Sequence, residues 1–368
     1  MGDRIVAAPV GLNTMAKRFS SWAFVLLFNA ALAAVIAGAA PSQPVLTDRN
    51  DYDYNAKRWL TAYCPNSIMC YRILVPALLE FVPVDAEPRW RGYQWLAHTA
   101  TGAVVAMAAA PIAAPLISSV LLQSSYGFAF TAYDPYSPDP FVFLIAALTL
   151  YLWLVDRVLA MTLMAGAGVF AKETVALVAS VPAIAVLLSD RMQKWRWFEP
   201  AVVAWSLLLF FHWWMDTYAG WSIRQSQSSN FLTGSCLVLS WRNSFGTKML
   251  LLFAPFGFGW VFAALGYRYA TPPFRQLALG AVLPIAALAY VQTPERALGN
   301  AFFVIVPLAA AFLSRVSPAA AWAAAITNGL VTAKIGLSAP WLPSSSILMF
   351  PAALSAVWAI ASSRRQST

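Results

Sequence analysis

Long apolar runs follow one another along this 368-residue sequence, and they limit its fold more than any other feature. A helix needs about 20 largely apolar residues to cross a bilayer. Runs of this kind fill most of the chain, which is 60% hydrophobic and only 11% charged. No stretch remains that is long enough for a separate soluble domain. The sequence therefore predicts a single transmembrane domain over residues 1–368.

The apolar runs are continuous rather than alternating, which favours helices over a transmembrane β-barrel. We expect an all-α fold, a polytopic membrane bundle of about 12 (10–13) helices. Pro111, Pro115 and Pro182 leave open that neighbouring runs form re-entrant or broken helices instead of full crossings. The expected spans lie near 20–40, 92–110, 112–131, 141–156, 158–171, 174–189, 201–216, 247–267, 276–292, 299–314, 317–336 and 345–361.

The net charge of +9 points to membrane topology, because the basic residues stand singly in loops between apolar runs. We expect no nucleic-acid partner. The number of Lys and Arg is the same on both faces, but most acids fall on the face that also has the longer loops, 41–91 and 217–246. We interpret that face as the outer one, with 1–19 and 362–368 inside. The run at 20–40 is then a retained signal anchor.

The first outer loop carries three carboxylates just beyond the first span, Asp48, Asp51 and Asp53. Such groups can take a proton from a hydroxyl or hold a divalent cation, and they are equally compatible with a solvated loop. Cys64 and Cys70 lie in the same loop and can pair if it faces an oxidising compartment.

Arg72 immediately precedes a short apolar stretch, which predicts an interfacial helix at the end of this loop. An arginine there can fork onto a phosphate or pair with a loop carboxylate. Snorkelling to the interface also explains it.

Asp134 and Asp139 lie in a proline-rich outer turn, and Asp139 precedes a span in the manner of an N-cap followed by proline. Lys172 and Glu173 stand between two apolar runs. Unpaired charge is costly at membrane depth, so that pair must be interfacial, mutually neutralised or facing a wet cavity.

Glu295 and Arg296 stand at the entrance of a later span on the same predicted face. Arg296 suits a phosphate as well as it suits a simple ion pair. The sequence has only two histidines, far apart, so a His-rich metal site is not expected, and we interpret His98 as a hydrogen-bonded core residue.

These segments, in this order, resemble the GT-C superfamily of polytopic glycosyltransferases, which use polyprenyl-phosphate-linked sugars outside the cytoplasm. Members typically place acidic residues just after the first span, as Asp51 and Asp53 do here, with Asp48 as a spare. The other similar segments are Tyr71-Arg72 with Pro76, Ser137-Pro-Asp-Pro140, Ala171-Lys-Glu-Thr174 and Pro294-Glu-Arg-Ala-Leu-Gly-Asn300.

The resemblance implies a membrane glycosyltransferase of the bacterial inner membrane. It would move a sugar from a polyprenyl-phosphate donor to a lipid or glycan acceptor on the periplasmic face. Asp51 or Asp53 would be the base of an inverting reaction, and these two residues would also be the ligands of a divalent cation, if the enzyme uses one. Cations would hold the departing phosphate, and neighbouring acids would adjust how strongly those cations bind it. The implied binding residues are Arg72, Lys172, Glu173, Glu295, Arg296, Asp134 and Asp139. The chain ends near the last expected span, without the soluble domain of larger members.

Two other functions remain open on the residues alone. A transporter or lipid flippase would fit the many spans and the Lys172–Glu173 pair, although the two halves of the chain show no similarity to each other. A non-catalytic scaffold subunit would keep the fold without the chemistry.

Overall fold

A computed structural model describes residues 12–41, 52, 71–187, 194–218, 245–285 and 294–365. Within these ranges the secondary structure is helical and contains no strand, which confirms the all-α prediction. Asp48, Asp51, Asp53, Cys64 and Cys70 lie outside the described residues. The helices are α1 Leu12–Ala39, α3 Leu74–Glu80, α4 Ala86–Ala109, α5 Pro115–Gln123, α6 Tyr126–Tyr133, α7 Asp139–Leu154, α8 Val158–Gly168, α9 Thr174–Leu187, α10 Glu199–Tyr218, α13 Phe245–Phe253, α14 Gly259–Gly266, α15 Pro272–Gly280, α16 Val282–Ile285, α17 Pro294–Gly299, α18 Phe302–Leu313, α19 Pro318–Leu337 and α20 Ser345–Arg365.

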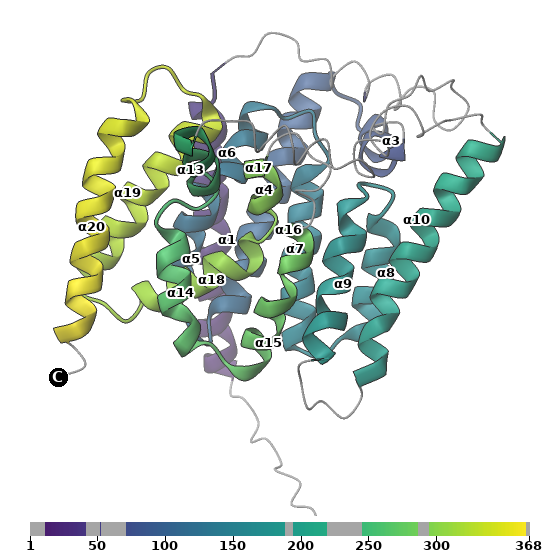
Figure 1. Cartoon of the computed structure of the whole chain (residues 1–368). Coiled ribbons are helices and arrows are strands. Elements are labelled where there is room, and N and C mark those ends of the chain that lie inside the picture. Colours follow the sequence, from purple (N-terminus) through teal and green to yellow (C-terminus); the bar gives the residue numbers. More distant parts are fainter. Residues whose placement is uncertain are drawn as a thin grey trace, which may run out of the picture.

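The helices form a bundle in which α4 packs against α1 and α7, and α10 packs against α8 and α9. On the other side α14 packs against α18, and α19 lies between α6 and α20. The short helices α3 and α17 lie near one end of the bundle, whereas α1 begins and α20 ends at the opposite end (Figure 1).

Three helical segments among the described residues are long and apolar enough to cross a membrane, namely Ser21–Ala39, Trp195–Tyr218 and Ser345–Ser363. Shorter apolar helices occupy Asp139–Leu154, Val158–Gly168, Thr174–Leu187 and Phe302–Leu313. Length and composition therefore support a membrane protein.

Several expected spans are broken in the structure. The run expected at 112–131 is two helices, α5 and α6, and the run expected at 247–267 is also two, α13 and α14. The second break contains Gly257, whose φ of 56° lies in the left-handed region that favours glycine. The Asn328 side chain fixes this turn, because its Oδ1 accepts the Phe258 N–H at 2.8 Å and its Nδ2 donates to the Phe256 carbonyl at 3.1 Å. Pro182, in contrast, lies inside α9 without ending it.

A buried polar network joins α1, α4, α5 and α6. Asn29 donates to Ser119 Oγ at 2.9 Å and accepts from Gln123 Nε2 at 3.2 Å. His98 is fully buried, with Gln94 Nε2 2.8 Å from its Nδ1 and Thr131 Oγ1 2.9 Å from its Nε2. The interpretation of His98 as a hydrogen-bonded core residue is confirmed.

Candidate functional site

Arg72 lies just before α3, and it binds Glu173 from the turn between α8 and α9. The guanidinium donates from Nε to Oε2 at 3.1 Å and from Nη2 to Oε1 at 2.7 Å, which is a two-point fork on one carboxylate. Its remaining Nη1 donates to the Tyr52 hydroxyl at 3.2 Å. All three guanidinium nitrogens are therefore engaged, and the snorkelling interpretation of Arg72 is wrong because the group is buried and bonded.

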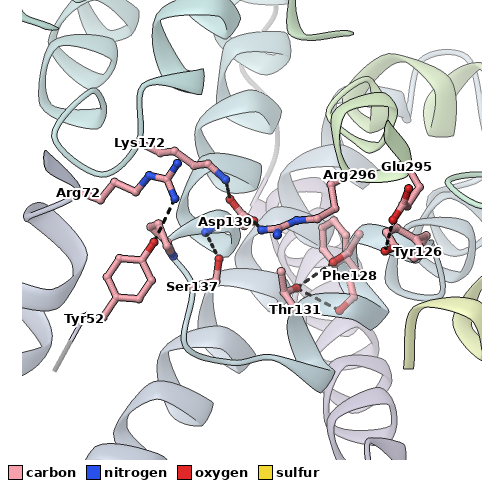
Figure 2. A network of polar contacts seen from close by, with 12 residues as sticks. Tyr52, Arg72, Tyr126, Phe128, Thr131, Ser137, Asp139, Lys172, Glu295 and Arg296 are labelled. Atoms are coloured by element: carbon pink, nitrogen blue, oxygen red, sulfur yellow. Dashed lines mark hydrogen bonds and ion pairs between the residues drawn. The ribbon is translucent and has the colours of Figure 1, made fainter. Parts of the chain in front are cut away.

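Asp139 holds two cations from different parts of the chain (Figure 2). Lys172 Nζ binds its Oδ1, and Arg296 Nη2, from α17, donates to its Oδ2 at 2.6 Å. The N-cap interpretation of Asp139 is wrong, because α7 starts at this residue, Pro138 takes the cap position and no side-chain capping bond forms. The carboxylate instead satisfies buried cations.

Lys172 and Glu173 neutralise other partners, Asp139 and Arg72, rather than each other. They lie in one turn, so the two groups of ion pairs form a single unit of five side chains, which we call the ion-pair cluster: Arg72, Asp139, Lys172, Glu173 and Arg296.

The cluster contains three cations and only two carboxylates. Arg72 and Lys172 are nearly buried, with 11% and 14% of their side chains exposed, whereas Arg296 is 31% exposed. The Arg296 guanidinium lies over the ring of Phe130, 4.9 Å from the ring centroid. A buried surplus of positive charge is costly unless an anion completes it. Arg296 is the cation that an anion from solvent or from the membrane surface reaches first.

Burial and neighbouring charges together shift the pKa values of Lys172 and Glu173. Burial raises the pKa of Glu173, but the charge and hydrogen bonds of Arg72, with a further contribution from Lys172, hold that pKa below its ordinary value. Burial lowers the pKa of Lys172, the charges of Arg72 and Arg296 lower it further, and Asp139 only partly opposes this. An added anion would therefore stabilise the charged form of Lys172.

Glu295 precedes Arg296 but contacts a different partner. Its Oε1 accepts the Tyr126 hydroxyl at 3.2 Å, as Figure 2 shows, and its buried Oε2 has no hydrogen-bond partner. Asp134 is buried at the C-terminal end of α6, five residues before Asp139. Glu295 is thus not part of the cluster.

The structure adds contacts that the sequence did not predict. The Tyr71 hydroxyl donates to Oδ1 of Asp216 at 2.5 Å, and the His212 ring stacks on Tyr71 with centroids 4.2 Å apart. This bond fastens the residue before Arg72 to the C-terminal end of α10. Only the position of Asp216 at the end of an apolar run could have indicated it.

An apolar groove of about 560 Å³, which we call the first groove, lies between α3 and α10 next to the cluster. Its lining includes Ile73, which follows Arg72, and Phe170, two residues before Lys172. The Leu74 N–H donates to the Phe170 carbonyl at 3.0 Å. The other lining residues include Leu78, Phe81, Phe210 and Trp214, all exposed. An amphiphile with a charged head would find both an apolar surface and cations here.

Within the part of the chain that the structure describes, no group of three or more His, Cys, Asp or Glu side chains could hold a metal ion. The sequence matches no known family model and no curated protein.

Proposed function

We propose that the chain is a membrane glycosyltransferase that uses a polyprenyl-phosphate-linked sugar. The observation that carries this proposal is the ion-pair cluster, in which three cations face two carboxylates and one cation remains partly exposed. Two unit charges 4 Å apart interact by about 4 kcal/mol at an effective dielectric constant of 20. A phosphate at Arg296 would complete the charge balance of the cluster.

The first groove supports a lipid-borne phosphate rather than a free one. It is apolar, and its lining includes Ile73, which follows Arg72, and Phe170, two residues before Lys172. We assign the groove to the prenyl chain of the donor and the cluster to its phosphate.

In the proposed reaction a first-loop aspartate, Asp51 or Asp53, takes the proton of an acceptor hydroxyl. The hydroxyl oxygen forms the new bond to the anomeric carbon as the bond from that carbon to the phosphate oxygen breaks. The polyprenyl phosphate leaves with the electron pair, and the cations of the cluster stabilise the charge that develops on it. Asp48 is the spare base in this scheme.

We further propose a GT-C-like bundle of about 12 helices in a bacterial inner membrane, with the cluster on the periplasmic side. The start of α1 and the end of α20 would then lie on the cytoplasmic side. Their location at the same end of the bundle, opposite α3 and α17, supports this topology.

The test is native mass spectrometry of the full chain in mild detergent with added polyprenyl phosphate. We expect the wild type to retain this lipid and Arg296→Gln to lose at least about tenfold in retention, the ratio that 1.4 kcal/mol produces. Arg315→Gln is the matched control, because Arg315 is exposed and lies beyond the far end of α18. Equal retention by all three proteins would overturn the proposal and favour a transporter or a scaffold.

A further inference from the structure

A second apolar groove, of about 610 Å³, runs along α4 and α7. Leu79, Val82 and Val84 line it, whereas earlier residues of α3 line the first groove, so α3 and the turn after it separate the two. The α4 residues that line it run from Pro88 to Ala100. At 1.5 Å per residue this is about 18 Å of helix, long enough to accompany a hydrocarbon chain.

Gly92, in the second turn of α4, opens this groove. A Cβ atom built there would meet no atom within 4 Å. Glycine inside a helix costs about 1 kcal/mol relative to alanine, and close packing against a neighbour is the usual reason for it. No such neighbour exists at Gly92, so the missing side chain only adds space to the groove.

Arg89 lines the same groove, and its side chain is only 10% exposed. Its Nη1 binds Glu80 at 3.2 Å and donates to the Leu79 carbonyl at 3.1 Å. Its Nε is buried without a hydrogen-bond partner. An unpaired buried donor costs about 1–3 kcal/mol, and an oxygen of a molecule in the groove would remove that cost.

Arg89 is the charged side chain that lines the second groove, and Glu80 neutralises it. The lining therefore offers a phosphate no uncompensated cation, in contrast to the cluster. A hydroxyl or ether oxygen of an uncharged head group can still accept a hydrogen bond from Arg89 Nε.

Tyr93 connects the second groove to the cluster. Its side chain lines the groove, while its hydroxyl accepts the Phe141 N–H at 3.0 Å and donates to the Pro138 carbonyl at 3.3 Å. Asp139 lies between these two residues. A head group beside Tyr93 would therefore approach the turn that carries Asp139.

We infer that the second groove binds the hydrocarbon chain of an uncharged, hydroxyl-bearing lipid, with an oxygen of its head group on Arg89 Nε. Resting on the proposed function, this lipid is the acceptor of the sugar. The two lipids are thus sorted by charge, the phosphate-bearing donor to the cationic cluster and the neutral acceptor to the second groove, where Glu80 neutralises Arg89.

The test uses the full chain in phosphatidylcholine nanodiscs with a dodecyl glucoside that carries a photoactivatable diazirine in its chain. Mass spectrometry of peptides should locate the label on α4 between Gly92 and Ala100 and on α7 near Leu144. Excess unlabelled dodecyl glucoside should reduce it about tenfold, and phosphatidylglycerol should not. Gly92→Leu, which fills open space and improves helix propensity, should reduce labelling as strongly. Gly38→Leu, in α1, where a Cβ atom would also meet no atom within 4 Å, is the matched control and should leave it unchanged.

Labelling that phosphatidylglycerol reduces equally, or that persists in Gly92→Leu, would mean bulk membrane lipid only and would overturn the inference. Polyprenyl-phosphate retention is measured on the same samples. If retention persists while glucoside labelling fails, the second site alone is wrong. Glucoside labelling without any polyprenyl-phosphate retention would overturn the acceptor role, since the proposed donor site would then have failed.

Discussion

Arg296 donates to Oδ2 of Asp139 at 2.6 Å, although 157 residues separate them in the chain. Lys172 binds the other oxygen of the same carboxylate. Asp139 therefore binds the same two cations that a phosphate would bind. It also keeps Lys172 and Arg296 near each other when no phosphate is present.

Removing the Asp139 charge should strengthen anion binding. We expect Asp139→Asn to raise polyprenyl-phosphate retention at least about tenfold, because the variant leaves Lys172 and Arg296 without their shared counter-charge. Native mass spectrometry over a lipid titration measures this. Asp156→Asn, just beyond the other end of α7, is the control and should bind as the wild type does. Unchanged or weaker retention in Asp139→Asn would argue against a phosphate at the cluster.

Removing one partner of the Arg72–Glu173 ion pair should destabilise the protein more than replacing both partners with apolar residues. Arg72→Met leaves a buried carboxylate without its partner, which typically costs about 3–5 kcal/mol. The double variant Arg72→Met/Glu173→Met removes both charges and should recover most of that loss. Thermal unfolding in detergent measures both. A double variant as unstable as the single one would mean that Arg72 acts mainly through Tyr52 or through packing.

Stability should fall in acid through Glu173. Its pKa in the folded protein lies below the ordinary value of 4.5, so the stabilisation is fully present above that value. It is lost as the pH falls through the lower, folded pKa. Unfolding temperatures of wild type and Glu173→Gln between pH 7 and pH 3 should therefore converge as the pH falls. Parallel curves over this range would show that Glu173 does not contribute in this way.

Gly257→Ala should destabilise the α13–α14 turn. The left-handed conformation costs a residue with a Cβ about 1–2 kcal/mol, and the new atom would lie 2.3 Å from Asn328 Oδ1. Gly92→Ala provides the contrast, because its Cβ would stand in open space and its helix propensity would improve by about 1 kcal/mol. Thermal unfolding should move in opposite directions in these two variants. Equal shifts would show that the Asn328 contact does not constrain the turn.

The sequence predicted the positions of the helices better than the points at which they break. The apolar runs that became α7, α8 and α9 were expected close to their observed bounds, because such runs need internally satisfied backbone groups. Both the break between α5 and α6 and the Gly257 turn are bound by distant segments. The Thr332 hydroxyl donates to the Ser124 carbonyl at the first, and Asn328 accepts the Phe258 N–H at the second. Pattern along the chain carries no information about them.

The site residues were found by residue type, but their pairing was not. Charges beside apolar runs must be neutralised, which is why Arg72, Lys172 and Arg296 stood out. Proximity in sequence suggested Lys172 with Glu173, whereas the fold pairs them with Asp139 and Arg72. Tyr52 and Tyr126 gave no signal, because tyrosines are common at membrane interfaces.

Asn29 in α1 finds its partners only in α5, 90 and 94 residues later in the chain. Synthesis runs from the N-terminus, so α1 enters the bilayer before Ser119 and Gln123 exist. Until then its amide has only the Val25 carbonyl of its own helix. Hydrocarbon offers no hydrogen-bond partners, so an incompletely bonded Asn29 amide is unfavourable there. Its hydrogen bonds to α5 are correspondingly favourable once that helix is present. The Asn29 amide is thereby fully hydrogen-bonded only after α5 has been made.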